Sequence, residues 1–107
     1  MNQQLDSILK NFKEQIRRQF GNEIVDIILF GSQARGDANQ DSDIDVLIVT
    51  KNDDWHLGDQ IGEVAYNILL ETGIYISTKI IGEQQYVYLN QIHAPFLENV
   101  KKEGISL

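Results

Sequence analysis

The sequence predicts a domain of the α/β or α+β class, in which helices cover a small central sheet. Three observations support this prediction. Two almost wholly apolar runs, Ile27–Phe30 and Ile44–Val49, are typical of strands buried on both faces. A third run, residues 74–81, is rich in β-branched and aromatic residues, and stretches with helical spacing of apolar residues separate the runs. A chain of 107 residues is long enough for one core, so we expect residues 1–107 to form a single domain.

Composition and charge exclude several classes of protein. The apolar content of 42% and charged content of 23% are ordinary for a soluble globular protein. The absence of cysteine excludes a disulfide framework and a thiolate zinc site, and it fits a reducing, cytoplasmic setting. No apolar run approaches the length of a membrane span, so no membrane association is expected. The formal net charge of −7 argues against direct nucleic-acid binding and instead suits a basic protein partner or divalent cations.

Residues 3–20 are predicted to form an amphipathic helix, followed by the first strand. A helical stripe of apolar residues marks the helix: Leu5, Ile8, Leu9, Phe12, Ile16 and Phe20. Gly21 follows it, where we expect a left-handed C-terminal cap. The strand, Ile24–Phe30, is apolar on both faces except for Asp26, which indicates a central place in the sheet.

A Gly-Ser turn is expected directly after this strand. Ser32 is placed to cap a short helical turn with its hydroxyl, and such a turn would direct backbone N–H groups at a phosphate. Gly31 would let the phosphate approach the backbone without a side chain in the way. Gly36 would form the exit turn. This segment is therefore interpreted as a phosphate cradle.

Paired carboxylates mark the start of the second strand, Ile44–Thr50. Asp43 and Asp45 are two residues apart, and such residues in a strand point to the same face. Two carboxylates facing a Gly-Ser turn indicate a metal site beside the phosphate cradle. The alternative is that residues 41–43 form only a turn and strand cap, but a turn does not require Gly-Ser at the end of the other strand.

The second half of the chain continues the alternation of helix and strand. A helix is expected between the capping residues 52–54 and Gly73, and a third strand, Ile74–Ile81, is ended by Gly82. Residues 83–90 should form a short helix. A last helix should begin near Pro95 and stop at Gly104, with Lys101 and Lys102 near its end. The residues expected to pack inward from this region are Tyr86, Leu89, Phe96, Leu97, Val100, Ile105 and Leu107.

The motif between the first two strands resembles the signature of the DNA polymerase beta superfamily of nucleotidyltransferases. Gly31-Ser32 is followed by ten residues and then by Asp43-Ile44-Asp45. The fuller strings, residues 30–36 and 42–47, are similar to the minimal nucleotidyltransferase (MNT) domains of the antitoxin type. The resemblance implies a polymerase beta-like nucleotidyltransferase fold, with a small mixed central sheet flanked by helices. It also implies Mg²⁺-dependent transfer of a nucleoside monophosphate, with ATP as the substrate.

The resemblance assigns roles to the motif residues. Asp43 and Asp45 would be the catalytic carboxylates and the Mg²⁺ ligands, in keeping with the preference of this ion for carboxylate, phosphate and water oxygens. Gly31 and Ser32 would hold the terminal phosphates and the pyrophosphate leaving group. Ser42 would support the metal site or orient Asp43 by a hydrogen bond.

Arg35 has two interpretations that the sequence does not separate. It could contact a phosphate, or it could form a structural ion pair with Asp37, Asp41 or Asp43. His56 and His93 have no neighbours at metal-ligand spacing and are expected at the surface. The remaining aromatic residues are more typical of core and rim packing than of a base-stacking platform: Trp55, Tyr66, Tyr75, Tyr86 and Tyr88.

The third strand departs from the pattern of the superfamily. Catalytic members usually carry a third carboxylate there, which completes the metal site and takes the proton of the attacking hydroxyl. Residues 74–81 contain no acid; Ser77 is the first candidate replacement and Thr78 the next. Glu71 and Glu83 flank the strand and would have to reach in from its ends. Lys79 could contact a phosphate, although an exposed lysine is also common on an edge strand.

Three functions follow from these expectations. The first is transfer of AMP from ATP to a hydroxyl; the resemblance to MNT domains implies that this hydroxyl belongs to a HEPN-domain ribonuclease toxin, which the chain would neutralise as its antitoxin. The second is a degenerate nucleotide-binding module that neutralises a protein partner by binding alone, which the missing third carboxylate motivates. The third is an aminoglycoside-type, small-molecule nucleotidyltransferase, in which a dimer or neighbouring chain would supply the missing wall of the site. A homo-oligomer or hetero-oligomer is compatible with each.

Overall fold

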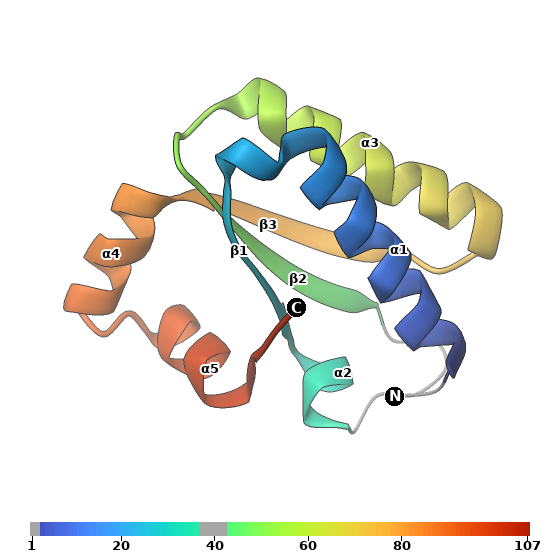
Figure 1. Ribbon diagram of the computed structural model, residues 1–107. Helices are drawn as coiled ribbons and strands as arrows, with labels where there is room; N and C mark the ends of the chain where they lie inside the picture. Colours follow the sequence, from blue (N-terminus) through green and yellow to red (C-terminus); the bar gives the residue numbers. More distant parts are fainter. Residues whose placement is uncertain (1–2, 37–42) are drawn as a thin grey trace.

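The computed structural model describes residues 3–36 and 43–107. They form a four-stranded mixed sheet of strand order β3-β2-β1-β4. Helices α1 and α3 cover one face of the sheet, and α4 and α5 cover the other (Figure 1). This arrangement confirms the predicted fold class. The strands are β1 (Ile24–Phe30), β2 (Ile44–Thr50), β3 (Ile76–Gly82) and β4 (Ile105–Ser106).

The sheet is mixed because its connections differ in length. β1 and β2 are antiparallel, whereas β2 and β3 are parallel and are joined by the crossover helix α3 (Trp55–Thr72). β1 lies inside the sheet, as its apolar composition predicts. The segment expected to pack back at the C-terminus pairs with β1 as β4, and the N–H of Leu107 donates to the carbonyl of Ile27 at 2.8 Å. Leu107 packs against the core as expected, but Ile105 does not: its side chain is exposed, because β4 is an edge strand.

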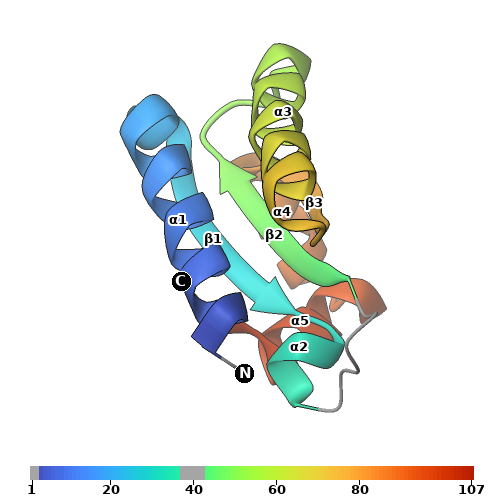
Figure 2. The ribbon, with the colours of Figure 1, turned by 90° about the vertical axis from the view of Figure 1, so that its right-hand side faces the viewer.

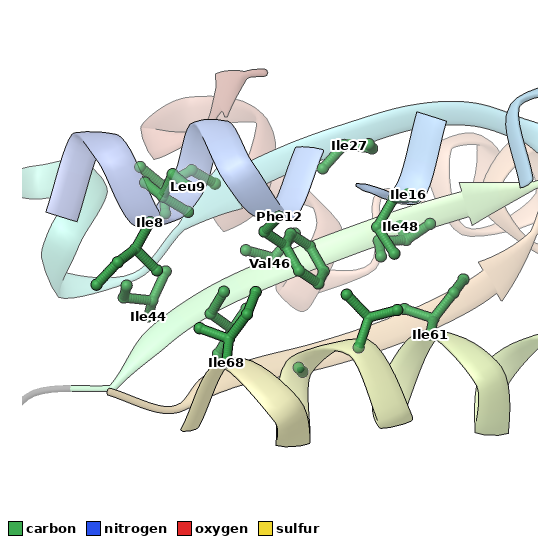
Figure 3. Close-up of a cluster of buried hydrophobic side chains, with 14 of the residues drawn as sticks. Ile8, Leu9, Phe12, Ile16, Ile27, Ile44, Val46, Ile48, Ile61 and Ile68 are labelled. Carbon is green, nitrogen blue, oxygen red and sulfur yellow. The ribbon is translucent and has the colours of Figure 1, made fainter. Parts of the chain in front are cut away.

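The larger part of the core lies between the sheet and the two long helices. α1 (Gln3–Phe20) buries one side of its predicted stripe against β1, β2 and α3, and Figure 3 shows these side chains meeting. Burial of these mostly branched aliphatic side chains is the main contribution to the stability of the packing between helices and sheet. The labelled residues of this cluster are Ile8, Leu9, Phe12, Ile16, Ile27, Ile44, Val46, Ile48, Ile61 and Ile68.

The opposite face of the sheet is covered by two short helices, α4 (Glu83–Gln91) and α5 (Pro95–Glu103). Ile28, Leu47 and Val49 pack there against residues of α5. The inward positions predicted for these helices are confirmed, and α5 begins at a proline as expected. This smaller cluster therefore lies on the face of β2 that carries Asp45, Leu47 and Val49.

Two helix ends test the capping predictions. Gly21 does not form a left-handed cap: residues Gly21–Glu23 make a 3₁₀ turn (η1), and the N–H of Ile24 donates to the carbonyl of Gly21. The turn satisfies carbonyl groups at the end of α1, so no left-handed residue is needed. At α3 the predictions hold, with Asp54 as the N-cap and Gly73 left-handed at φ 77°.

The aromatic residues expected in core and rim packing lie mostly at the surface. Trp55, Tyr66, Tyr75 and Tyr88 are between 44% and 69% exposed and are not core residues, whereas Tyr86 packs against the smaller cluster. The two histidines lie at the surface as predicted. No helix within the described ranges is long and apolar enough to cross a membrane.

Candidate nucleotidyltransferase site

The two halves of the motif meet at one end of the sheet. β1 and β2 run antiparallel, so the end of β1 lies beside the start of β2, with Phe30 opposite Asp45. The short helix α2 (Ser32–Arg35) follows β1 directly and sits below its tip, beside the first residues of β2 (Figure 2). The α2 turn therefore lies at the end of the sheet that carries Asp45.

Gly31 is in direct contact with Asp45. Its backbone adopts φ 76° and ψ −159°, a conformation that only glycine adopts readily. A Cβ atom at this position would lie 2.5 Å from Oδ2 of Asp45. Both the backbone conformation and the packing therefore require glycine here, and the expected closeness of turn and carboxylate is observed.

The helical turn begins one residue earlier than predicted. Gly31, rather than Ser32, occupies the N-cap position, and no side chain caps the turn. The N–H of Arg35 donates to the carbonyl of Gly31 at 3.1 Å, which makes Ser32 the first helical residue. The predicted capping role of the Ser32 hydroxyl is therefore wrong, because the unusual conformation of Gly31 starts the turn. Gly36 is left-handed at φ 82° and forms the exit turn, as expected.

Asp45 is half-buried and Asp43 is exposed at the entrance of β2. Burial raises the pKa of Asp45, and the charge of Asp43 raises it further, while Lys79 and Arg35 act in the opposite direction. A pair of carboxylates that repel each other is a site that a cation would stabilise. Ser42, the third predicted residue of this segment, lies outside the described residues.

The carboxylates of Asp43 and Asp45 are suitable ligands for a Mg²⁺ ion that also binds a phosphate of the substrate. Mg²⁺ is commonly held by one or two carboxylates, with phosphate and water oxygens completing the octahedron. Across residues 3–36 and 43–107, no group of three or more His, Cys, Asp or Glu side chains could hold a metal ion. The two carboxylates Asp43 and Asp45 therefore suit an ion whose remaining ligands come from the substrate and water.

Ser77 lies opposite Asp45 in the parallel ladder of β2 and β3. Residues paired in this way present their side chains on the same face, so Phe30, Asp45 and Ser77 form one row across three strands. Thr78 is paired with the buried Val46 and belongs to the other face, which removes it as a candidate.

Neither flanking glutamate can supply the third carboxylate from its place in the fold. Glu83 follows Gly82, which pairs with Thr50 at the far end of β2. Glu71 lies on α3, which covers the opposite face of the sheet. Of the described residues considered for this position, Ser77 is the one that shares the row of Asp45.

Helix α5 contacts two basic residues near the carboxylates. Arg35 forms an ion pair with Glu103 at 3.1 Å, a partner that was not among those predicted. Two of the predicted partners, Asp37 and Asp41, lie outside the described residues. The Nζ atom of Lys79 lies 5.6 Å from the centroid of the Phe96 ring. Sequence reasoning missed both contacts, because Glu103 is 68 residues from Arg35 and carries no local signal.

Comparison with known proteins identifies the class of this domain. A family model described as a nucleotidyltransferase domain matches residues 9–103. The chain therefore belongs to this family, and it is a nucleotidyltransferase.

Its relatives include "Putative protein adenylyltransferase MJ0604" of Methanocaldococcus jannaschii, which is 35% identical over 92% of this chain and 93% of the relative. The protein adenylyltransferase MntA of Thermococcus cleftensis is 41% identical over 46 residues, which cover 43% of this chain and 44% of that protein. Among solved structures, a Sulfolobus solfataricus protein titled a putative nucleotidyltransferase has the same fold. Its TM-score is 0.54 at 20% identity, over 94% of this chain and 76% of that one.

Proposed function

We propose that this nucleotidyltransferase moves AMP from ATP onto a hydroxyl group, with Mg²⁺ held by Asp43 and Asp45. The observation that carries this proposal is the contact between Gly31 and Asp45, which brings the turn after β1 against the carboxylate pair. The AMP donor is supported by the names of the relatives, two of which are called protein adenylyltransferases.

In the proposed reaction the acceptor oxygen attacks the α-phosphorus of ATP. The bond between that phosphorus and the oxygen leading to the β-phosphate breaks, and pyrophosphate leaves. Gly31 and Ser32 hold the phosphates of the leaving group, and Asp43 and Asp45 would hold the Mg²⁺ ion beside them. The ion, when bound, neutralises the charge that develops on the phosphate oxygens.

The proton of the acceptor hydroxyl has no carboxylate on the third strand to receive it. Ser77, in the row of Asp45, is not a base at neutral pH. With Asp43 and Asp45 engaged as ligands of the ion, the proton acceptor in this proposal is water, a route that is easier for a phenol, with a pKa of about 10, than for an aliphatic alcohol. A tyrosine of a protein substrate is for this reason the acceptor that we favour.

We further propose that the acceptor belongs to a HEPN-domain toxin and that the chain acts as its antitoxin in the cytoplasm. A formal net charge of −7 suits a basic ribonuclease, because opposite charges steer association. The relative called MntA is named a protein adenylyltransferase, which is in keeping with a protein as the acceptor. A protein acceptor needs no second domain to enclose it, unlike the small-molecule substrate of an aminoglycoside-type enzyme.

The test is transfer of label from [α-³²P]ATP to a co-purified HEPN-domain protein in the presence of Mg²⁺. We expect label on the partner with the wild type, and a loss of at least about a hundredfold with Asp43→Asn or Asp45→Asn, because each removes a charge from the ion site. Asp59→Asn, on the exposed side of α3, is the matched control and should transfer label normally.

The second candidate, neutralisation by binding alone, is favoured by the serine in the row of Asp45. A growth assay with the co-expressed toxin separates the two functions. Under the transfer proposal, Asp45→Asn loses protection while still forming the complex. Full protection by Asp45→Asn, with no label transferred by the wild type, would instead establish the binding module.

A further inference from the structure

The third strand brings a cation, rather than a carboxylate, to the face of the sheet that carries Asp45. Lys79 lies two residues beyond Ser77 on β3, so the two side chains leave the strand on the same face. This is the face covered by α4 and α5, because Lys79 pairs with Leu47, a member of their cluster. β3 is an edge strand, and the Lys79 side chain is exposed.

Aromatic contacts hold the Lys79 ammonium close to the row of Asp45. Its Nζ atom lies 5.6 Å from the centroid of the Phe96 ring, within the range of a cation–π interaction. The Phe96 ring in turn packs edge-on against Phe30 with 5.6 Å between centroids. Phe30 is the direct neighbour of Asp45 across the ladder. The ammonium of the exposed Lys79 is thereby held over the Phe96 ring, where its charge acts on Asp45.

Lys79 acts on Asp45 but forms no ion pair with a carboxylate of the described residues. The described carboxylates include none within 4.0 Å of its ammonium. Its charge still acts on Asp45, as does that of Arg35, which is bound to Glu103. An ammonium that acts on Asp45 and forms no ion pair with a described carboxylate is suited to an anion that arrives with the metal ion.

We infer that Lys79 binds the triphosphate from the third strand and takes the place of a second metal ion, so that the site holds one divalent cation per nucleotide. The inference rests on the proposed function. Ser77 offers no negative charge to a second dication, and the neighbouring ammonium would repel one. A lysine ammonium provides a compact charge and three N–H donors for phosphate oxygens. Phe96 would act as a positioning residue through its contact with Lys79.

The first test measures binding of α,β-methylene-ATP, whose α–β bond cannot be cleaved by transfer, in the presence of Mg²⁺ by calorimetry. We expect Lys79→Gln to weaken binding by about tenfold or more, since a charged hydrogen bond to phosphate is lost. Lys79→Arg keeps the charge and should bind within about threefold of the wild type. Lys101→Gln, in the exposed last turn of α5, is the control and should bind normally. Wild-type affinity in Lys79→Gln would overturn the inference.

The second test counts metal ions. Equilibrium dialysis with Mn²⁺ and saturating α,β-methylene-ATP, with both species measured across the membrane, should give one ion per bound nucleotide in the wild type. The double variant Ser77→Asp, Lys79→Gln restores a carboxylate to the row of Asp45 and should bind two. Two ions in the wild type would overturn the inference, and so would one ion in a double variant that binds nucleotide.

The results of these tests distinguish a failure of the role inferred for Lys79 from a failure of the proposed function on which it rests. If the wild type binds no nucleotide, or if Asp45→Asn binds it as well as the wild type, the proposed function fails and the role of Lys79 fails with it. If Asp45→Asn weakens binding but Lys79→Gln does not, only the role of Lys79 fails. Thermal unfolding of each variant shows that a loss of binding is not a loss of fold, because Lys79 is exposed and its replacement should leave the core intact.

Discussion

Gly31 joins the two halves of the motif at the scale of a single residue. Its positive φ starts the α2 turn, and its missing side chain leaves room for the Asp45 carboxylate. A phosphate held by the turn and an ion held by Asp45 would therefore be neighbours. This contact explains why a glycine at the end of one strand and a carboxylate at the start of the next occur together in the motif.

Gly31→Ala should remove nucleotide binding and destabilise the fold. The backbone conformation costs a residue with a Cβ atom about 1–3 kcal/mol, and that atom would also displace Asp45. The measurements are urea unfolding and calorimetric titration with Mg²⁺ and ATP.

Gly36→Ala is the matched control for this substitution. Gly36 also has a positive φ, of 82°, but a Cβ atom there would meet nothing within 4 Å. We expect a similar backbone penalty, of about 1 kcal/mol, with nucleotide binding retained. Equal losses of binding in the two variants would contradict the proposed role of the Gly31–Asp45 contact.

Helix α5 matters at the scale of an element because it touches both cations near the site. Glu103 pairs with Arg35, and Phe96 lies under Lys79. The same helix buries Leu97 and Val100 against the sheet, which fixes its place. A helix that sequence patterning assigns to the core therefore also orients the charges that face the carboxylates.

The Arg35–Glu103 pair separates the two interpretations of Arg35. Both side chains are partly exposed, 44% and 26%, so Arg35→Gln and Glu103→Gln should each change the free energy of unfolding by less than about 1 kcal/mol. We expect Arg35→Gln to weaken binding of Mg²⁺ and ATP severalfold, because a charge opposite the phosphates is lost.

Glu103→Gln should leave that binding unchanged, since it leaves the guanidinium in place. Calorimetric titration of both variants checks this expectation. If the two substitutions weaken binding equally, the pair is structural and Arg35 does not contact the nucleotide.

At the scale of the whole molecule, placing the Asp45 carboxylate in the site lowers the stability of the fold by an amount that depends on pH. The raised pKa of Asp45 means that the folded state favours the protonated form of this side chain. Between its ordinary pKa of 3.8 and the raised value, the folded chain binds more protons than the unfolded chain. The contribution of Asp45 to stability therefore falls as the pH rises through that window.

Asp45→Asn should consequently be more stable than the wild type at neutral pH in buffer with EDTA, and the difference should vanish below pH 3.8. Urea unfolding of both proteins across this pH range is the measurement. Mg²⁺ with ATP should close the gap at neutral pH by stabilising only the wild type. A wild type that is more stable than Asp45→Asn in EDTA at pH 7 would contradict the account.

Much of the fold follows from patterns that are local in the sequence. The apolar stripes of residues 3–20, the capping residues of α3 and the proline of α5 act over one or two helical turns. The errors are local as well: β3 begins at Ile76 instead of Ile74, and α1 ends in a 3₁₀ turn. In both places the limit of the element is set by the adjoining connection, which the local composition does not indicate.

The sequence by itself determined the motif, because Gly31, Ser32, Asp43 and Asp45 lie close along the chain between two recognisable strands. Only the tertiary structure decided which residues of the second half join them. The parallel register of β2 and β3 puts Ser77 in the row of Asp45 and Thr78 on the other face. The packing of α5 supplies Glu103 and Phe96. The register follows from closing the α3 crossover over one face of the sheet, and the place of α5 follows from its packing on the other face. No single segment of the chain contains that information.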